Sequence, residues 1–133
     1  MGHRESGIDM RQAIIAEIEG WLQSGLYNTD NWDGQGGSAI NESSIQDIKT
    51  FLQKLEGRIR YPETNLLVSG NISLLYREVG SYADLEFPGT GIVKYFIKTD
   101  GETHKDQFNL HEEDMPEIVN RVVIWKLDVD KEN

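Results

Sequence analysis

The sequence predicts an α+β domain made of two N-terminal helices, an antiparallel β-meander of four to five strands and a C-terminal helix, with a final strand as the alternative for the last element. Changes in hydrophobic period predict this order. Apolar residues recur at helical spacing up to about residue 56, alternate with polar residues from about 65 to 110, and then return to helical spacing. The length of 133 residues favours one domain, 1–133, with one core.

Two amphipathic stretches predict the N-terminal helices. The first is expected over residues 8–24, before the stop signal Gly25, with a buried stripe of Ile14, Ile15, Ile18, Trp21 and Leu22. The second is expected to begin at Asn41, an N-cap residue, and to end at Gly57. Its buried side chains are expected to be Ile45, Ile48, Phe51, Leu52 and Leu55, with Ile40 packed on Ile45 as a hydrophobic staple.

The alternating region is expected to form three hairpins. Gly80-Ser81 fits a two-residue type II′ loop, residues 88–92 fit a five-residue loop, and Asp100-Gly101 marks a third tight turn. These loops set the expected cross-strand pairs, which are Tyr76 with Leu85, Leu74 with Phe87, Arg77 with Asp84, Phe87 with Val93 and Glu86 with Lys94. Apolar pairs then share one face and opposite charges share the other, as a consistent register requires.

The C-terminal segment is the most ambiguous element. A helix is expected over residues 115–126, with Pro116 in its first turn, where the missing backbone N–H does no harm. The density of β-branched residues makes a strand over 121–127 the competing prediction. The run Glu112-Glu113-Asp114 is expected in the approach to the helix and its first turn, where the helix dipole favours negative charge.

A glycine-rich loop, Asn-Trp-Asp-Gly-Gln-Gly-Gly at residues 31–37, separates the two N-terminal helices. We expect Trp32 to dock into the seam between these helices, where its burial would contribute about 2–3 kcal/mol. Asp33 and Gly34 favour a tight turn, because the carboxylate can accept a hydrogen bond from a nearby backbone amide and glycine allows positive φ. The sequence therefore predicts a structural motif formed by Asn31, Trp32, Asp33, Gly34 and Gly36.

This loop and the strand after the second helix resemble a widespread family of small, mostly uncharacterised bacterial proteins. The family carries Asn-Trp-Asp-Gly-x-Gly, then a helix, then a strand that opens with Gly-x-Ile-x-Leu. The matching positions over about residues 15–100 are Asn31, Trp32, Asp33, Gly34, Gly36, Gly70, Ile72 and Leu74. The chain departs from the family at Gly37, where a small residue such as Ala is expected, and at Leu75-Tyr76, where an acidic residue and Trp are expected. The resemblance implies the fold and the loop, and it implies no activity.

Three functional interpretations of the loop compete with the structural one. A calcium loop aligned on Gly34 would place Thr29 first and Ile40 twelfth, where carboxylates are required. A phosphate-binding or ligand-sensing loop over Gly34–Gly37 lacks a preceding strand and a following Gly-Lys-Ser/Thr. The third interpretation is a partner-binding loop with Trp32 facing solvent, since Trp is a frequent anchor at interfaces.

Candidate catalytic groups are few. His104 and Asp106 lie two residues apart on one face of a strand that is expected to point inward, and they form the strongest candidate acid–base pair. His111 beside an acidic run is the other candidate, although it lacks the short helical spacing of zinc enzymes. We therefore expect no catalytic residue, no metal site and no cofactor, with a small enzyme using these histidines as the alternative.

Composition and charge limit the classes of chemistry and of binding partner that we expect. The chain has no Cys, which excludes disulfides and thiolate chemistry, and no apolar run long enough to span a membrane. The formal net charge of −10 disfavours direct binding to nucleic acid, because that affinity comes largely from cations at phosphates. We expect a cytoplasmic protein of bacterial, phage or mobile-element origin with a protein partner. Because the chain is negatively charged, we expect this partner to be basic.

The expected function is a non-catalytic protein-interaction module, of the antitoxin, immunity or anti-defence inhibitor type or an accessory subunit. The expected partner surface is the outward face of the hairpins, which carries Ser73, Leu75, Arg77, Tyr82, Asp84, Glu86, Lys94 and Phe96. Its apolar members, Leu75, Tyr82 and Phe96, indicate a partner site or a homodimer seam, because a purely solvated face needs no large apolar groups. The alternative is that the last helix crosses back and covers this face.

Overall fold

The computed structural model describes residues 10–24, 37, 39–78 and 80–124. Its elements in chain order are α1 (Met10–Ser24), α2 (Glu42–Lys54), β1 (Glu63–Leu66), β2 (Ile72–Glu78), β3 (Ser81–Phe87), β4 (Ile92–Thr99), β5 (Glu102–Asn109) and α3 (Glu117–Val123). The strands form one antiparallel sheet in the order β1-β2-β3-β4-β5. The α+β class with a meander of sequential strands is thus confirmed.

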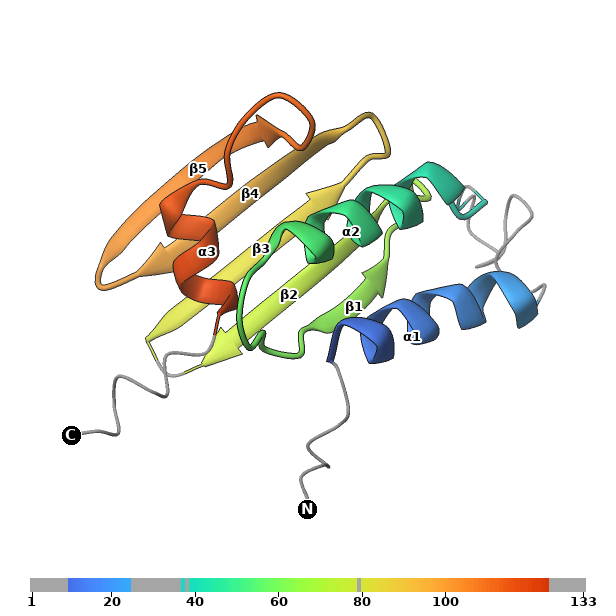
Figure 1. Ribbon diagram of the computed structural model, residues 1–133, viewed down its shortest axis with the longest axis horizontal. Coiled ribbons are helices and arrows are strands. Elements are labelled where there is room, and N and C mark those ends of the chain that lie inside the picture. Colours follow the sequence, from blue (N-terminus) through green and yellow to red (C-terminus); the bar gives the residue numbers. More distant parts are fainter. Residues whose placement is uncertain (1–9, 25–36, 38, 79, 125–133) are drawn as a thin grey trace, which may run out of the picture.

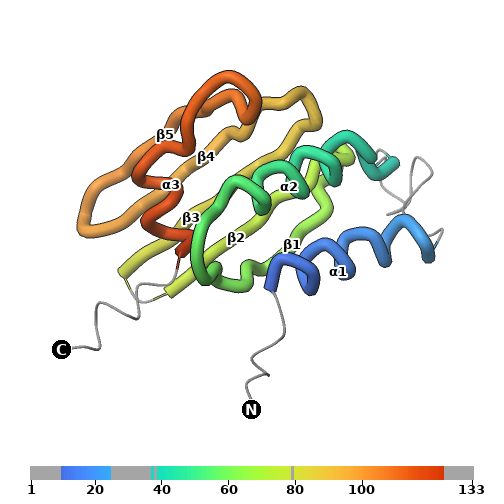
Figure 2. Tube along the Cα trace, in the orientation of Figure 1, coloured from blue at the N-terminus to red at the C-terminus, as the bar shows by residue number. Residues whose placement is uncertain are grey.

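The three helices lie on the same side of the sheet (Figure 1). We call the side that they cover the inner face and the opposite side the outer face. The trace in Figure 2 shows the same two-layer arrangement, with α3 over β4 and β3 and with α1 beside the short edge strand β1. One-sided coverage is common in antiparallel sheets, because alternate residues of each strand can be apolar toward the core and polar toward solvent.

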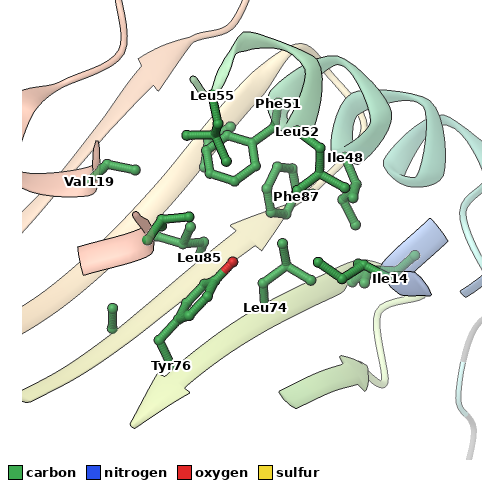
Figure 3. Packing of buried hydrophobic residues seen from close by; sticks show 14 of the residues in the cluster. Ile14, Ile48, Phe51, Leu52, Leu55, Leu74, Tyr76, Leu85, Phe87 and Val119 are labelled. Atoms are coloured by element: carbon green, nitrogen blue, oxygen red, sulfur yellow. The ribbon is translucent and has the colours of Figure 1, made fainter. Parts of the chain in front are cut away.

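The core lies between the helices and the inner face (Figure 3). Phe51 of α2 meets Phe87 of β3 edge to face, with ring centroids 5.3 Å apart, and both side chains are fully buried. Leu74 and Leu85, which are paired across β2 and β3, extend this layer. Tyr76 also points into the core, and its hydroxyl is buried without a hydrogen-bond partner among the described residues.

Both N-terminal helices follow the predicted stripes. Ile14 and Ile18 of α1 are fully buried, and Ile15, Trp21 and Leu22 pack against the core with partial exposure. Asn41 caps α2 through its side chain, which accepts a hydrogen bond from the Ser43 backbone N–H, so the predicted N-cap is confirmed.

The predicted end of the second helix at Gly57 is wrong. The helix stops at Lys54, and Leu55 is already extended at φ −76° and ψ 140°. At this end the guanidinium of Arg11 of α1 donates to the carbonyls of Leu52 at 2.9 Å, Leu55 at 2.8 Å and Gly57 at 3.0 Å. A cation from another helix thus satisfies the free carbonyls at this C-terminus.

The first hairpin has a different register from the predicted one. Glu78 pairs with Ser81, so the two-residue loop is 79–80 and not Gly80-Ser81. The observed pairs that replace the predicted ones are Tyr76 with Ala83, Leu74 with Leu85, Arg77 with Tyr82 and Ile72 with Phe87. This pairing puts Gly80 at the second loop position, where it has φ +78°, a value that glycine adopts without steric strain. The slip is two residues, so every side chain remains on its predicted face.

The two later hairpins match their predictions. Glu86 pairs with Lys94 across β3 and β4, and Thr99 pairs with Glu102 around the turn at Asp100-Gly101. In this turn both Asp100 and Gly101 have positive φ, at 54° and 78°. Asp-Gly is a pair that adopts this conformation readily.

The last helix is shorter than predicted. It covers Glu117–Val123 with Pro116 as its N-cap residue, and Ile124 then forms an isolated bridge with Ile59. Residues 125–127 of the competing strand lie outside the described residues. The acidic run 112–114 belongs to the turn after β5, where the Asn109 side chain accepts from the backbone N–H of His111 and of Glu112. The run therefore lies in the approach to the helix, as expected, and not in the first helical turn, because an Asx turn holds it after β5.

Candidate functional site

The outer face of the sheet is the candidate site, and the register determines which side chains share it. Alternation along each strand puts all the predicted partner-binding residues there, namely Leu75, Arg77, Tyr82, Asp84, Glu86, Lys94 and Phe96. Leu75, Asp84, Phe96 and Lys105 form one row across β2 to β5. The last helix does not cover this face, because Val119, Val122 and Val123 of α3 pack into the core on the inner side.

An aromatic pair occupies the middle of the outer face. Phe96 is 37% exposed, which makes it one of the few large apolar side chains open to solvent in the described parts of the chain. Its ring lies edge to face with that of Tyr82, at 6.1 Å between centroids and 70° between planes. The Arg77 guanidinium carbon lies 5.9 Å from the centre of the Tyr82 ring, within cation–π range. These contacts fix the aromatic pair in place while leaving Phe96 accessible.

Beside the aromatic pair the outer face is hollowed. Asp84, Glu86, Lys94, Phe96 and Lys105 contribute to an open depression of about 680 Å³. Its size is within the range of ligand pockets, but it is a shallow region of a sheet face rather than an enclosed cavity. The geometry therefore fits a protruding side chain or an opposing surface better than a sequestered small molecule.

Charge is divided across this face. The acidic residues are Glu63, Asp84 and Glu86 on β1 and β3, whereas the lysines are Lys94, Lys98 and Lys105 on β4 and β5. Arg77 on β2 pairs with Glu63, at 3.4 Å between Nε and Oε1. The outer face is therefore close to neutral in a chain with a net charge of −10, so most of the negative charge lies elsewhere.

Asp84 has an unfavourable environment for a carboxylate. Its partial burial between strands β2 and β4, followed by the negative charge of Glu86, raises the pKa of Asp84 above its usual value. Glu86 itself accepts a hydrogen bond from the Asn71 side-chain amide at 2.8 Å. The two carboxyl groups therefore lie close together beside the exposed ring of Phe96.

Leu75 differs from the expectation that it is open to solvent. The side chain is only 8% exposed, although it lies on the outer face. The ion pair between Arg77 and Glu63 joins two residues that flank Leu75 in the register, and long charged side chains of this kind shield apolar neighbours. Leu75 is thus a buried member of the outer face, and Phe96 is its accessible apolar group.

The glycine-rich motif cannot be placed in the same way. Asn31, Trp32, Asp33, Gly34 and Gly36 lie outside the described residues, so their predicted structural role stays a prediction. Gly37, the last residue of the motif, is buried.

His104 and Asp106, the alternative acid–base pair, each have a separate partner in the structure. His104 and Asp106 do lie on the inner side of β5, opposite Ile97 and Tyr95. However, His104 Nε2 is 3.5 Å from Glu102 Oε1, and Asp106 accepts from the Gln107 backbone N–H at 2.8 Å. No group of His, Asp or Glu side chains in the described ranges could hold a metal ion.

His111 is exposed and packs on the loop before β4. A Cβ placed on Gly91 would come within 3.2 Å of the His111 ring. This contact gives the ring a packing role against the Gly91 backbone and brings no acid–base partner to it.

Sequence reasoning missed a set of polar side chains that anchor the loop between β3 and β4. The Asn41 amide donates to the Pro88 carbonyl at 2.6 Å, the Ser44 hydroxyl donates to the Phe87 carbonyl, and Asp47 accepts from the Gly91 N–H at 2.8 Å. Ser44 and Asp47 are buried. The signal was present as polar residues three apart, at positions 41, 44 and 47, beside the apolar stripe of the helix.

Comparisons with known proteins do not indicate a function for this chain. No family model, curated protein or solved structure matches the chain. Among the helices that the structure describes, none has the length and apolar character needed to cross a membrane.

Proposed function

We propose that the chain is a non-catalytic protein-interaction module whose partner binds the outer face of the sheet. The observation that carries this proposal is the accessible Phe96, which is held by Tyr82 and lies in an open hollow on the face that the helices leave uncovered. Exposed apolar groups with a charged rim are characteristic of interaction surfaces. The biological setting that fits is an inhibitor of the antitoxin, immunity or anti-defence type, or an accessory subunit, of bacterial or phage origin.

The chemistry of the face favours a protein over a nucleic acid. Asp84 and Glu86 lie directly beside the aromatic pair, where they would repel phosphates. A basic protein would meet these carboxylates on β3, and its approach would be aided by the net negative charge of the chain. A rigid antiparallel sheet also presents its side chains at fixed spacing, which reduces the entropy lost on binding.

The test is co-purification with the products of neighbouring genes after co-expression. We expect a stable partner to co-purify with the wild-type chain and to be lost with Phe96→Glu, because a buried carboxylate would replace the apolar anchor. Val68→Glu is the matched control, since Val68 is an apolar side chain, 60% exposed, in the turn between β1 and β2. A partner that stays bound to folded Phe96→Glu would contradict the proposed surface.

A further inference from the structure

We infer that the outer face binds a second copy of this chain, with β3 of each copy lying over β4 of the other in a two-fold symmetric pair of sheets. This inference rests on the proposed function in one respect, namely that the outer face is a protein-binding surface. It goes further by naming the occupant and the arrangement. The observation behind it is the separation of charge across the face, with carboxylates on β3 and lysines on β4 and β5.

A surface with this separation complements itself. In a two-fold interface each patch meets its counterpart reciprocally, so residue i contacts j and residue j contacts i. A face with acidic residues on one half and basic residues on the other becomes attractive to its own copy when the rotation exchanges the halves. A uniformly acidic face would repel its copy, and the net charge of −10 would then favour a monomer. The near-neutral outer face therefore opposes self-association less than a uniformly acidic surface would.

The register fixes which residues would meet. A two-fold axis that runs parallel to the strands, between β3 and β4, exchanges these strands and keeps each residue at its own level along them. Glu86 pairs with Lys94 at one level, and Tyr82 pairs with Lys98 at another. Across the interface, Glu86 would then face Lys94 of the second copy, and Tyr82 would face Lys98 of the second copy with the lysine near its ring. Phe96 pairs with Asp84 at the level between these two, so its ring would cover the half-buried Asp84 of the second copy.

The size of the face predicts a weak dimer. Strands about 4.8 Å apart and about 3.3 Å per residue give five strands of this length a footprint on the order of 500 Å². Two such faces would bury about 1,000 Å² in total, at the low end for specific complexes. Stacked sheets pack about 10 Å apart, which the two layers of side chains would fill. We expect dissociation at micromolar concentrations that becomes easier as salt screens the charge pairs.

Charge reversal tests the arrangement. Sedimentation equilibrium should show wild-type dimers that weaken at high salt, and Glu86→Lys or Lys94→Glu should each weaken dimerisation at least tenfold, because both contacts become repulsive. Mixing the two variants in equal amounts should restore a dimer. In one contact the lysine introduced at position 86 would face the glutamate introduced at position 94, and in the other the unchanged Lys94 and Glu86 would meet. Within either variant the neighbouring side chains on β3 and β4 still carry like charges, so only pairing between chains explains the restoration.

Controls separate this inference from a loss of folding. Lys54→Glu changes the same charge at an exposed position of α2, and it should leave the dimer unchanged. Glu86→Gln retains an oxygen that can accept from Asn71, so it should fold normally and weaken the dimer less than Glu86→Lys. Thermal melts of every variant establish that the fold is intact.

Four results would overturn the inference. If a folded single-reversal variant dimerises like the wild type, the proposed charge contacts are wrong. If the mixture of the two variants stays monomeric, the β3-over-β4 arrangement is wrong. If the wild-type chain stays monomeric up to millimolar concentration, the second copy is not the occupant of the outer face. A co-expressed partner that is lost with Phe96→Glu would then still support the proposed function. A labelled single-stranded DNA that binds the wild type and is released by Phe96→Ala would show that the face takes nucleic acid instead.

Discussion

Gly89→Ala should be among the most damaging single-methyl changes on the surface of this protein. Gly89 has φ +89°, and a Cβ built there would lie 2.7 Å from Asn41 Nδ2, 2.8 Å from Ser43 Oγ and 3.0 Å from the Ser44 backbone nitrogen. These atoms cannot withdraw easily. The Asn41 amide is bonded to the Pro88 carbonyl at 2.6 Å, and Ser43 Oγ is bonded to Asn41 Oδ1 at 2.7 Å.

The magnitude follows from two separate effects. A left-handed conformation destabilises a non-glycine residue by about 1–2 kcal/mol. Displacing Asn41 would also disrupt the α2 cap, at about 1 kcal/mol, and a hydrogen bond, at about 1 kcal/mol. Gly89→Ala should therefore lower the free energy of unfolding by about 3–4 kcal/mol.

A matched control isolates the contact from the conformation. Gly101 also has positive φ, at 78°, but no atom lies within 4 Å of the position that a Cβ would take there. Gly101→Ala should therefore lose only the conformational part, about 1–2 kcal/mol. Urea unfolding followed by far-UV circular dichroism measures both values. Equal losses in the two variants would show that the loop between β3 and β4 is not docked on the α2 N-terminus as described.

Three further changes test individual interactions. Arg11→Met should reduce stability by about 2 kcal/mol in the same urea assay, because three carbonyls at the end of α2 lose a charged donor, and Arg11→Lys should recover part of the loss; no loss would contradict the cap. Tyr76→Phe should stabilise the fold by up to about 1 kcal/mol, because it removes a buried hydroxyl without a partner, whose burial also raises the pKa of Tyr76; destabilisation would reveal a missed hydrogen bond. Asp84→Asn should raise the melting temperature at pH 7 and have little effect near pH 3, since the raised pKa means that ionised Asp84 destabilises the fold only above its unfolded pKa of about 4; a difference independent of pH would refute the assigned environment.

Hydrophobic periodicity and capping residues were sufficient to predict the fold class and the order of helices and strands. Asn41 as the N-cap and the Asp100-Gly101 turn followed from local chemistry alone, and the structure confirms both. The register of the first hairpin was not predictable in this way, because a slip of two residues keeps every side chain on the same face and leaves the hydrophobic pattern equally satisfied. Only the position of Gly80 within the loop distinguishes the two registers.

Long-range contacts account for the other differences. Arg11 and the end of α2 are separated by more than 40 residues, so no local signal showed that this cation would satisfy the carbonyls left free when the helix ends before Gly57. The shared face of the candidate site was predicted because alternation fixes faces. The burial of Leu75 was not predicted, because it depends on which residue of β1 lies beside it.

Lysine footprinting tests the central claim, that the outer face is a protein-contact surface, most directly. The chain would be acetylated at dilute and at high concentration, and with its partner once one is identified, and the extent at each lysine measured by mass spectrometry. We expect Lys94 and Lys105, at the rim of the hollow, to become protected on association, while Lys54 on α2 reacts equally in every state. Equal reactivity of all three lysines in a state shown to be associated would place the contact elsewhere and contradict the account.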